Sequence, residues 1–383
     1  MNKPNYQNSI VNLMSSILSA FSCKNNYASL DNFKIDSQKY QNIVCIVIDA
    51  LGYEFLKKHK SSFLHQNMQL KLSSVFPTTT SSAITSFLTA QAPLQHGMTG
   101  WYMYFKELAT AAVSLPFSPR FTGKPFDGLG ISGADVFNHE NAFDKNNISY
   151  SVMFPSATID SAYSSHSFNS PNKVAYEDHQ DFFATLSKKI RINEKKENMI
   201  FAYYPFFDAT AHVFGINSNE SNELFFKIDH DLQELIEKFD NGNTLFIITA
   251  DHGMVDIKED NKLQVQNFPI IEKSLILPLC GESRVPFAYV RPSYVKEFES
   301  FIYNDFTEYG TMMRLHEAID AELFGFGDIN PKLVDRVGDY IIFMKEEYVL
   351  LDPLFNEKAS QFIGFHGGLS DDELYVPLIR IGK

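Results

Sequence analysis

The sequence predicts an α/β fold in which a doubly wound, mainly parallel sheet lies between helices. Three short apolar runs, 43–48 (IVCIVI), 199–204 (MIFAYY) and 244–249 (TLFIIT), have the length and residue types of strands that are buried on both faces. Helical patterns lie between them, as in 222–239, where apolar residues recur near every third or fourth position. Strands that alternate with helices are typical of this fold class.

Two stretches depart from this alternation. Residues 101–198 are rich in Phe, Ser, Asn, Pro and Gly, and we expect them to form a loop-rich insertion over the site. Residues 262–362 contain strand-like runs at 285–290 and 337–344 and helical patterns at 294–303 and 311–323, which predicts a small α/β insertion. The expected organisation is a single catalytic α/β domain over 1–383 with these two insertions.

Composition excludes several classes of protein. The chain of 383 residues has 33 Lys and Arg against 46 Asp and Glu, a net charge of −13, which disfavours binding to a nucleic-acid polymer. A small phosphorylated substrate is compatible with this charge, because bound cations can reverse the local sign. The three cysteines are far apart and form no CxxC pair, so we expect neither a disulfide framework nor a cysteine-bound zinc.

The N-terminal segment 9–23 could be read as a weak signal peptide or as a helix of the folded domain. Its apolar residues recur at helical spacing, and Asn12, Ser15 and Ser16 interrupt any continuous apolar run. We therefore predict a docked amphipathic helix and a cytoplasmic protein. No stretch of the sequence is long and apolar enough to predict a membrane span.

Acidic residues and histidines follow the predicted strands. In doubly wound sheets ligands bind beyond the carboxyl ends of the strands, and an aspartate follows each of the three apolar runs. An aspartate in that place can also cap the next helix, but carboxylates and imidazoles together are suitable ligands for zinc and similar cations. The candidate ligands of a two-cation site are Asp49, Asp208, His212, Asp251, His252 and His366.

The charges of such a site favour an anionic substrate. Two divalent cations carry four positive charges and three carboxylates carry three negative ones, so a net positive charge remains for a phosphoryl group. Asp208 and His212 are four residues apart, which places them on one side of a helix.

A hydroxyl cluster supplies candidate nucleophiles. Thr78, Thr79, Thr80 and Ser81 follow Pro77 at the start of a predicted helix, where backbone N–H groups can bind an anion. The cluster could also be an ordinary N-cap, and its composition does not choose among the four hydroxyls. A threonine hydroxyl becomes a good nucleophile at neutral pH only when a metal lowers its pKa.

The sequence resembles the alkaline phosphatase superfamily and, within it, the type I phosphodiesterase/nucleotide pyrophosphatase family. The matching motifs occur in the family's order and are VIDALG (47–52), FPTTTSS (76–82), QHGMTG (95–100), DATAHVFG (208–215), TADHGM (249–254) and GFHGG (364–368). The resemblance implies an alkaline-phosphatase-like fold and two divalent cations, zinc or alternatively manganese. It also implies that Thr80 is the nucleophile and forms a transient phospho-threonine.

The resemblance divides the ligands between the two cations. Asp49, Thr80, Asp251 and His252 would bind one, and Asp208, His212 and His366 would bind the other. The implied activity is that of a phosphodiesterase or nucleotide pyrophosphatase on a small phosphorylated substrate. The alternatives are a phosphomonoesterase, a phosphonate hydrolase or a phosphomutase, and, from another class, an inactive metal-binding protein.

Substrate contacts are less well predicted. The family usually has an aromatic residue after the nucleophile, which stacks on a nucleotide base, and an asparagine three residues after it. Here those positions are Ser81 and Ala83, so nucleotide preference does not follow from the resemblance. The candidates to line a substrate pocket are Trp101, Tyr102 and His166.

Overall fold

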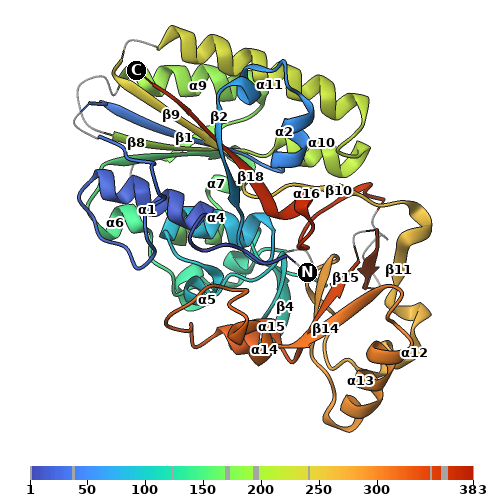
Figure 1. Cartoon of the computed structure of the whole chain (residues 1–383). Coiled ribbons are helices and arrows are strands. Elements are labelled where there is room, and N and C mark those ends of the chain that lie inside the picture. The colour runs from blue at the N-terminus through green and yellow to red at the C-terminus, as the bar shows by residue number, and fades with distance from the viewer. Residues whose placement is uncertain are drawn as a thin grey trace.

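The computed structural model of the chain describes residues 2–36, 39–121, 124–168, 173–192, 198–239, 242–345, 347–354 and 361–382. It contains a central sheet with helices on both faces, and a second sheet beside it (Figure 1). The predicted α/β class with an alkaline-phosphatase-like architecture is confirmed.

The central sheet is mainly parallel. In the described part of the chain it has seven strands, in the order β2 (Met68–Ser73), β18 (Tyr375–Ile381), β9 (Thr244–Thr249), β1 (Asn42–Ile48), β8 (Asn198–Tyr204), β6 (Tyr150–Pro155) and β7 (Lys173–Tyr176). The strands from β9 to β7 are parallel, whereas β18 is antiparallel to both β9 and β2.

The register of the central strands brings their carboxyl ends together. Val47 of β1 lies opposite both Tyr203 of β8 and Thr249 of β9. Every residue of β1 and β9 is buried, as expected for apolar strands covered on both faces. Loops that leave these three strands therefore begin at the same edge of the sheet.

Helices cover the two faces of this sheet (Figure 1). Helices α9 (His179–Ile192) and α11 (Asn219–Lys238) lie on one face, and α1 (Ile10–Ala20), α4 (Thr80–Thr89) and α6 (Ala142–Lys145) lie on the other. Helix α1 is more deeply buried than an amphipathic pattern requires. Its polar side binds segment 27–30, since Asn12 donates to the Ala28 carbonyl and Ser16 accepts from the Leu30 amide.

The second sheet is antiparallel and joins two distant segments of the chain. Its strands in the described residues run in the order β14 (Gly310–Arg314), β15 (Tyr340–Met344), β13 (Val285–Ala288), β12 (Cys280–Glu282), β3 (Tyr102–Phe105), β4 (Thr110–Val113) and β5 (Ser118–Pro119). The junction is the pairing of β12 with β3, where Gly281 lies opposite Tyr102. Helices α12 (Pro269–Ser274), α13 (Val295–Asn304), α14 (Leu315–Asp320) and α15 (Leu333–Val337) belong to the same part of the chain.

The structure corrects the interpretation of 101–198 as a loop-rich insertion. Strands β3, β4 and β5 of this stretch are part of the second sheet, and β6, β7 and α9 are part of the central layer. These strands are short and separated by Ser-, Asn- and Pro-rich turns, so their signal was too weak to detect. The helix predicted over 311–323 is also wrong in its first half, because 310–314 is strand β14 and only 315–320 is helix α14.

None of the helices in the described residues combines the length and the apolar character that a bilayer crossing requires.

Candidate active site

The predicted ligands meet at the carboxyl edge of the central sheet. Asp49 directly follows β1 and Asp251 lies two residues beyond β9. Asp208 and His212 lie on α10 (Phe206–Phe214), which follows β8, and His366 follows the short strand β17 (Gly364–Phe365). The register of β1, β8 and β9 brings together Asp49, Asp208 and Asp251, which are about 200 positions apart at most, and the loop after β17 adds His366.

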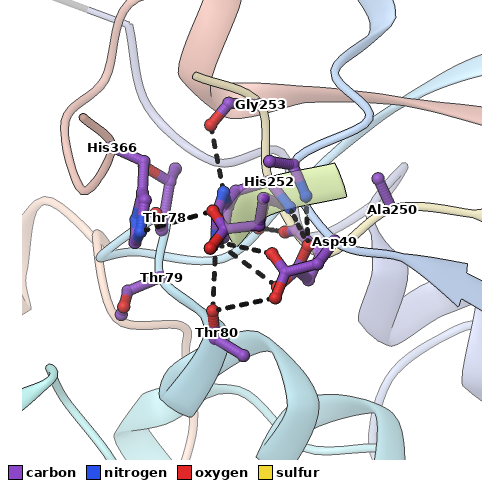
Figure 2. A network of polar contacts seen from close by, with 12 residues as sticks. Asp49, Thr78, Thr79, Thr80, Ala250, His252, Gly253 and His366 are labelled. Carbon is purple, nitrogen blue, oxygen red and sulfur yellow. Dashed lines mark hydrogen bonds and ion pairs between the residues drawn. The ribbon is translucent and has the colours of Figure 1, made fainter. Parts of the chain in front are cut away.

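The first cluster consists of Asp49, Asp251 and His252, and Figure 2 shows two of them, Asp49 and His252, side by side. His252 Nε2 lies 3.4 Å from Asp49 Oδ1 and 3.4 Å from Asp251 Oδ2. The other oxygen of each carboxylate is held by protein donors. Asp251 Oδ1 accepts hydrogen bonds from the amides of Ala50 and His252, at 3.1 and 2.9 Å, and Asp49 Oδ2 accepts one from the Tyr203 hydroxyl.

The second cluster consists of Asp208, His212 and His366. Asp208 Oδ2 lies 3.3 Å from His212 Nε2, and its Oδ1 lies 4.0 Å from His366 Nε2. The His366 ring stacks on the His252 ring with centroids 3.9 Å apart, so the two clusters are adjacent. The structure thus brings together all six predicted aspartates and histidines.

Hydrogen bonds fix the orientation of the three imidazoles. The Nδ1 atoms of His252, His212 and His366 lie 3.0, 2.8 and 3.0 Å from the carbonyl oxygens of Gly253, Gly364 and Thr78. A carbonyl can only accept, so each Nδ1 carries a hydrogen, and Nε2 is the nitrogen that can bind a cation.

This donor set fits cations. Among the described residues, Asp49 Oδ1, Asp208 Oδ1 and Asp251 Oδ2 are buried and accept no hydrogen bond. They face imidazole nitrogens, and cations bound between these groups would supply the partners that the buried oxygens lack. Nitrogen and carboxylate oxygen are the ligands that zinc takes most readily apart from thiolate.

Burial makes this site electrostatically costly without cations. Burial raises the pKa of the Asp49 carboxyl well above its usual range, and the neighbouring Asp251 carboxylate adds to the effect. Burial also raises the pKa of Asp208 and lowers that of His366 well below its usual range. Both shifts reflect the cost of charge in a buried site, a cost that bound cations offset.

Thr80 is the member of the hydroxyl cluster that reaches the ligands (Figure 2). It is the first residue of α4, and its Oγ1 lies 3.4 Å from Asp49 Oδ2 and 3.3 Å from His252 Nε2. The hydroxyls of Thr78 and Thr79 instead donate to the Gly368 carbonyl at 2.8 Å and to Glu282 at 2.6 Å. Ser81 is fully buried and its hydroxyl has no partner among the described residues. The geometry therefore selects Thr80 among the four hydroxyls.

A cavity of about 720 Å³ opens over Thr80 and the second cluster. Its lining in the described residues is Thr80, Trp101, Tyr102, Arg120, Asp208, Ala209, His212, Val213, Glu282, Ser283, Leu351, Asp352, Pro353, Phe362, Phe365 and His366. The predicted candidates Trp101 and Tyr102 thus line the same cavity as Thr80. His166 does not belong to this lining. It lines a different cavity together with His139, whose carbonyl lies 3.0 Å from His166 Nε2.

Three further residues of the site were missed by sequence reasoning. Tyr203 binds Asp49, and Glu282 accepts from Thr79 and from the Trp101 amide at 2.6 and 2.7 Å. Burial raises the pKa of the Glu282 carboxyl to about 7. Arg120 lies 4.0 Å from the centre of the Tyr102 ring and donates to the carbonyls of Leu279 and Asp352. Only Tyr203 had a local signal, since it is the next-to-last residue of the predicted strand 199–204.

Comparisons with known proteins agree with this geometry. Murine and human ectonucleotide pyrophosphatase/phosphodiesterase 5 have TM-scores of 0.64 and 0.65 at 17% and 16% identity, over 88% and 89% of this chain and 87% of each of theirs. Phosphonoacetate hydrolase from Sinorhizobium meliloti 1021 has a TM-score of 0.64 at 15% identity, over 88% of this chain and 89% of its own. These structures share the fold.

No curated protein matches the chain by sequence. The model of one family, "Type I phosphodiesterase / nucleotide pyrophosphatase", matches residues 43–369, a span that includes every residue of the two clusters and Thr80. The chain therefore belongs to the type I phosphodiesterase/nucleotide pyrophosphatase family of metal-dependent phosphoester hydrolases.

Proposed function

We propose that this protein hydrolyses phosphodiesters with Thr80 as its nucleophile. The observation that carries the proposal is the position of Thr80 Oγ1, which lies within 3.4 Å of ligands of the first cluster and opens onto the cavity. Thr80 Oγ1 attacks phosphorus, an O–P bond forms, and the bond to the leaving alcohol breaks. Water then cleaves the phospho-threonine and releases a phosphomonoester.

Two divalent cations would be bound by the two clusters, one by Asp49, Thr80, Asp251 and His252 and the other by Asp208, His212 and His366. When bound they supply positive charge that lowers the pKa of the Thr80 hydroxyl and offsets the charge of the phosphoryl oxygens. The chain itself contributes the first turn of α4, whose N–H groups have no partner inside the helix and point toward an anion.

The cavity supports a diester as the substrate. Trp101, Tyr102, Val213, Phe362 and Phe365 form apolar walls next to Thr80, and such walls suit an organic substituent on the phosphate. Arg120 provides the one guanidinium in the described lining, and it donates to the carbonyls of Leu279 and Asp352. The lining thus offers apolar surface for a second ester group and little cationic surface for the second charge of a monoester.

A nucleotide is a suitable substituent. One structure of murine ectonucleotide pyrophosphatase/phosphodiesterase 5 is a complex of an inactive form with AMP. Trp101 offers this chain an aromatic surface in the same cavity as Thr80. Residue 81 offers none, because the Ser81 side chain is fully buried. We propose that base stacking comes from the 101–102 wall rather than from the residue after the nucleophile.

The test is a comparison of kcat/KM for bis-p-nitrophenyl phosphate, p-nitrophenyl phosphate and phosphonoacetate, with Zn²⁺ or Mn²⁺ and with Thr80→Ala as the blank. We expect the diester to be preferred over the other two substrates by about tenfold or more, a difference of about 1.4 kcal/mol. Faster cleavage of the monoester or of phosphonoacetate would favour a phosphomonoesterase or a phosphonate hydrolase. Retention of two cations without turnover of any substrate would favour an inactive metal-binding protein.

Zinc is the proposed cation, with manganese as the alternative, because the ligand set combines three imidazoles with three carboxylates. Elemental analysis of the purified protein, followed by reconstitution of the chelated protein with each metal, distinguishes them. The cytoplasmic location stays a prediction from the N-terminal sequence.

A further inference from the structure

Glu282 is a carboxylate in the active-site cavity that the metal site does not use. It is the last residue of β12 in the second sheet, whereas none of the six predicted metal ligands follows a strand of that sheet. Its Oε1 accepts two hydrogen bonds, from Thr79 Oγ1 at 2.6 Å and from the Trp101 amide at 2.7 Å. Both bonds end on Oε1, and Glu282 is part of the cavity lining.

Close backbone contacts hold Glu282 in this place. A Cβ on Gly100 would lie 2.7 Å from the Gly281 Cα, so β12 can approach the segment before Trp101 only because residue 100 is glycine. A Cβ on Gly367 would lie 2.5 Å from the Glu282 Cβ, and Gly367 also has a φ of +119°, which disfavours other residues. Glu282 is therefore fixed between the nucleophile segment, the cavity wall and the loop that carries His366.

The charge of Glu282 is not paired with a cationic side chain among the described residues. Both of its hydrogen-bond donors, the Thr79 hydroxyl and the Trp101 amide, are neutral. The adjacent Arg284 instead forms a buried ion pair with Glu373 at 3.0 Å. A carboxylate of this kind is expensive to bury, which argues that it acts on what enters the cavity.

We propose that Glu282 is a specificity-determining residue that selects phosphodiesters over phosphomonoesters by placing a fixed negative charge beside the phosphoryl position. The inference rests on the proposed diesterase function. Thr79, which binds Glu282, is the neighbour of Thr80, so the carboxylate lies on the order of 7–10 Å from a phosphorus at Thr80. A monoester dianion carries one more negative charge than a diester, and at that range repulsion disfavours it by about tenfold or more.

The experiment measures kcat/KM for bis-p-nitrophenyl phosphate and p-nitrophenyl phosphate at pH 8.5 in the wild type, Glu282→Gln, Glu282→Ser and Glu282→Asp. We expect the monoester-to-diester ratio to rise about tenfold in the Gln and Ser variants and to stay near the wild-type value in the Asp variant, which keeps the charge. Any loss of folded protein cancels from this ratio, because both substrates are measured on one sample.

Thr79→Val is the matched control, because it removes the hydrogen bond to Glu282 and leaves the carboxylate in place. Its ratio should equal the wild-type ratio. If the monoester-to-diester ratio rises as much in Thr79→Val as in Glu282→Gln, Glu282 acts by holding the loop and not by its charge, and the inference is wrong. An unchanged ratio in both Glu282→Gln and Glu282→Ser would also overturn the inference, while the diesterase function would stand. A wild type that prefers the monoester would overturn the proposed function itself.

Discussion

Thr79 and Thr80 carry adjacent hydroxyls, and we expect removal of the Thr80 hydroxyl to reduce activity more and removal of the Thr79 hydroxyl to reduce stability more. The Thr80 hydroxyl makes two long contacts, of 3.4 and 3.3 Å, whereas the Thr79 hydroxyl donates at 2.6 Å to the half-buried carboxylate of Glu282. Thr80→Ala should therefore lower the free energy of unfolding by only about 1 kcal/mol, mostly from the lost methyl group. Thr79→Ala removes a donor from Glu282 and should cost about 1–3 kcal/mol.

The catalytic effects should have the reverse order. Thr80→Ala removes the atom that attacks phosphorus, so kcat should fall by at least about 10³-fold, or roughly 4 kcal/mol of barrier. Thr79→Ala leaves Thr80, Asp49 and His252 in place, and kcat should stay within about tenfold of the wild type.

Diester turnover, thermal unfolding and bound-metal content measured on both variants test this pair of expectations. At roughly 1–2 °C per kcal/mol for a chain of this length, the melting temperature of Thr79→Ala should be the lower of the two. Both variants should retain the bound metals. If Thr79→Ala is inactive and Thr80→Ala is active, the nucleophile is off by one residue and the reasoning from the α4 geometry is refuted.

Three other perturbations follow from the structure. Chelation with EDTA should lower the melting temperature, because it leaves the carboxylates of Asp49 and Asp208 without a compensating charge. A cation present at 1,000 times its Kd stabilises the folded state by about 4.1 kcal/mol. An unchanged melting curve after metal loss would contradict this expectation. Arg284→Met should cost about 3–5 kcal/mol in a denaturant titration, since it leaves Glu373 buried and unpaired, and the double variant with Glu373→Leu should regain part of that loss. Specificity constants for the four nucleoside triphosphates should lie within about tenfold of one another, because residue 81 supplies no base-stacking surface. A base–aromatic stack is worth roughly 1–3 kcal/mol. A preference above about a hundredfold for one base would show a dedicated base pocket.

The sequence was informative where strands are continuous and apolar. Runs 43–48, 199–204 and 244–249 became β1, β8 and β9 almost residue for residue, because strands buried on both faces have few polar interruptions. An aspartate beyond each strand then predicted the site, since parallel strands end at one edge. Thr80 could be chosen among the four hydroxyls only from the family resemblance or from the structure. Composition does not predict which side chain at the start of a helix points toward the metal ligands.

Other features depended on long-range contacts that no local pattern records. Strand β12 pairs with β3 across about 180 residues, so the second sheet could not be predicted from periodicity. Glu282 stands in a turn-like CGES sequence with nothing to mark it as a cavity residue. His166 was proposed as a substrate contact because it lies in the first insertion, but α8 (Ala162–Ser167) directs it to a different cavity.

The two sheets contribute different residues to the site. In the proposed mechanism, most of the groups around phosphorus follow strands of the central sheet, where the register of β1, β8 and β9 places Asp49, Asp208 and Asp251, and His366 comes from the loop after β17. The second sheet supplies the walls, since Tyr102 belongs to β3, Glu282 to β12, and Trp101 leads into β3. These walls touch the nucleophile segment through one hydrogen bond from Thr79 to Glu282. Substitutions in β3 and β12 should therefore change which ester is accepted, whereas substitutions beyond β1 and β9 should change how fast any ester is cleaved.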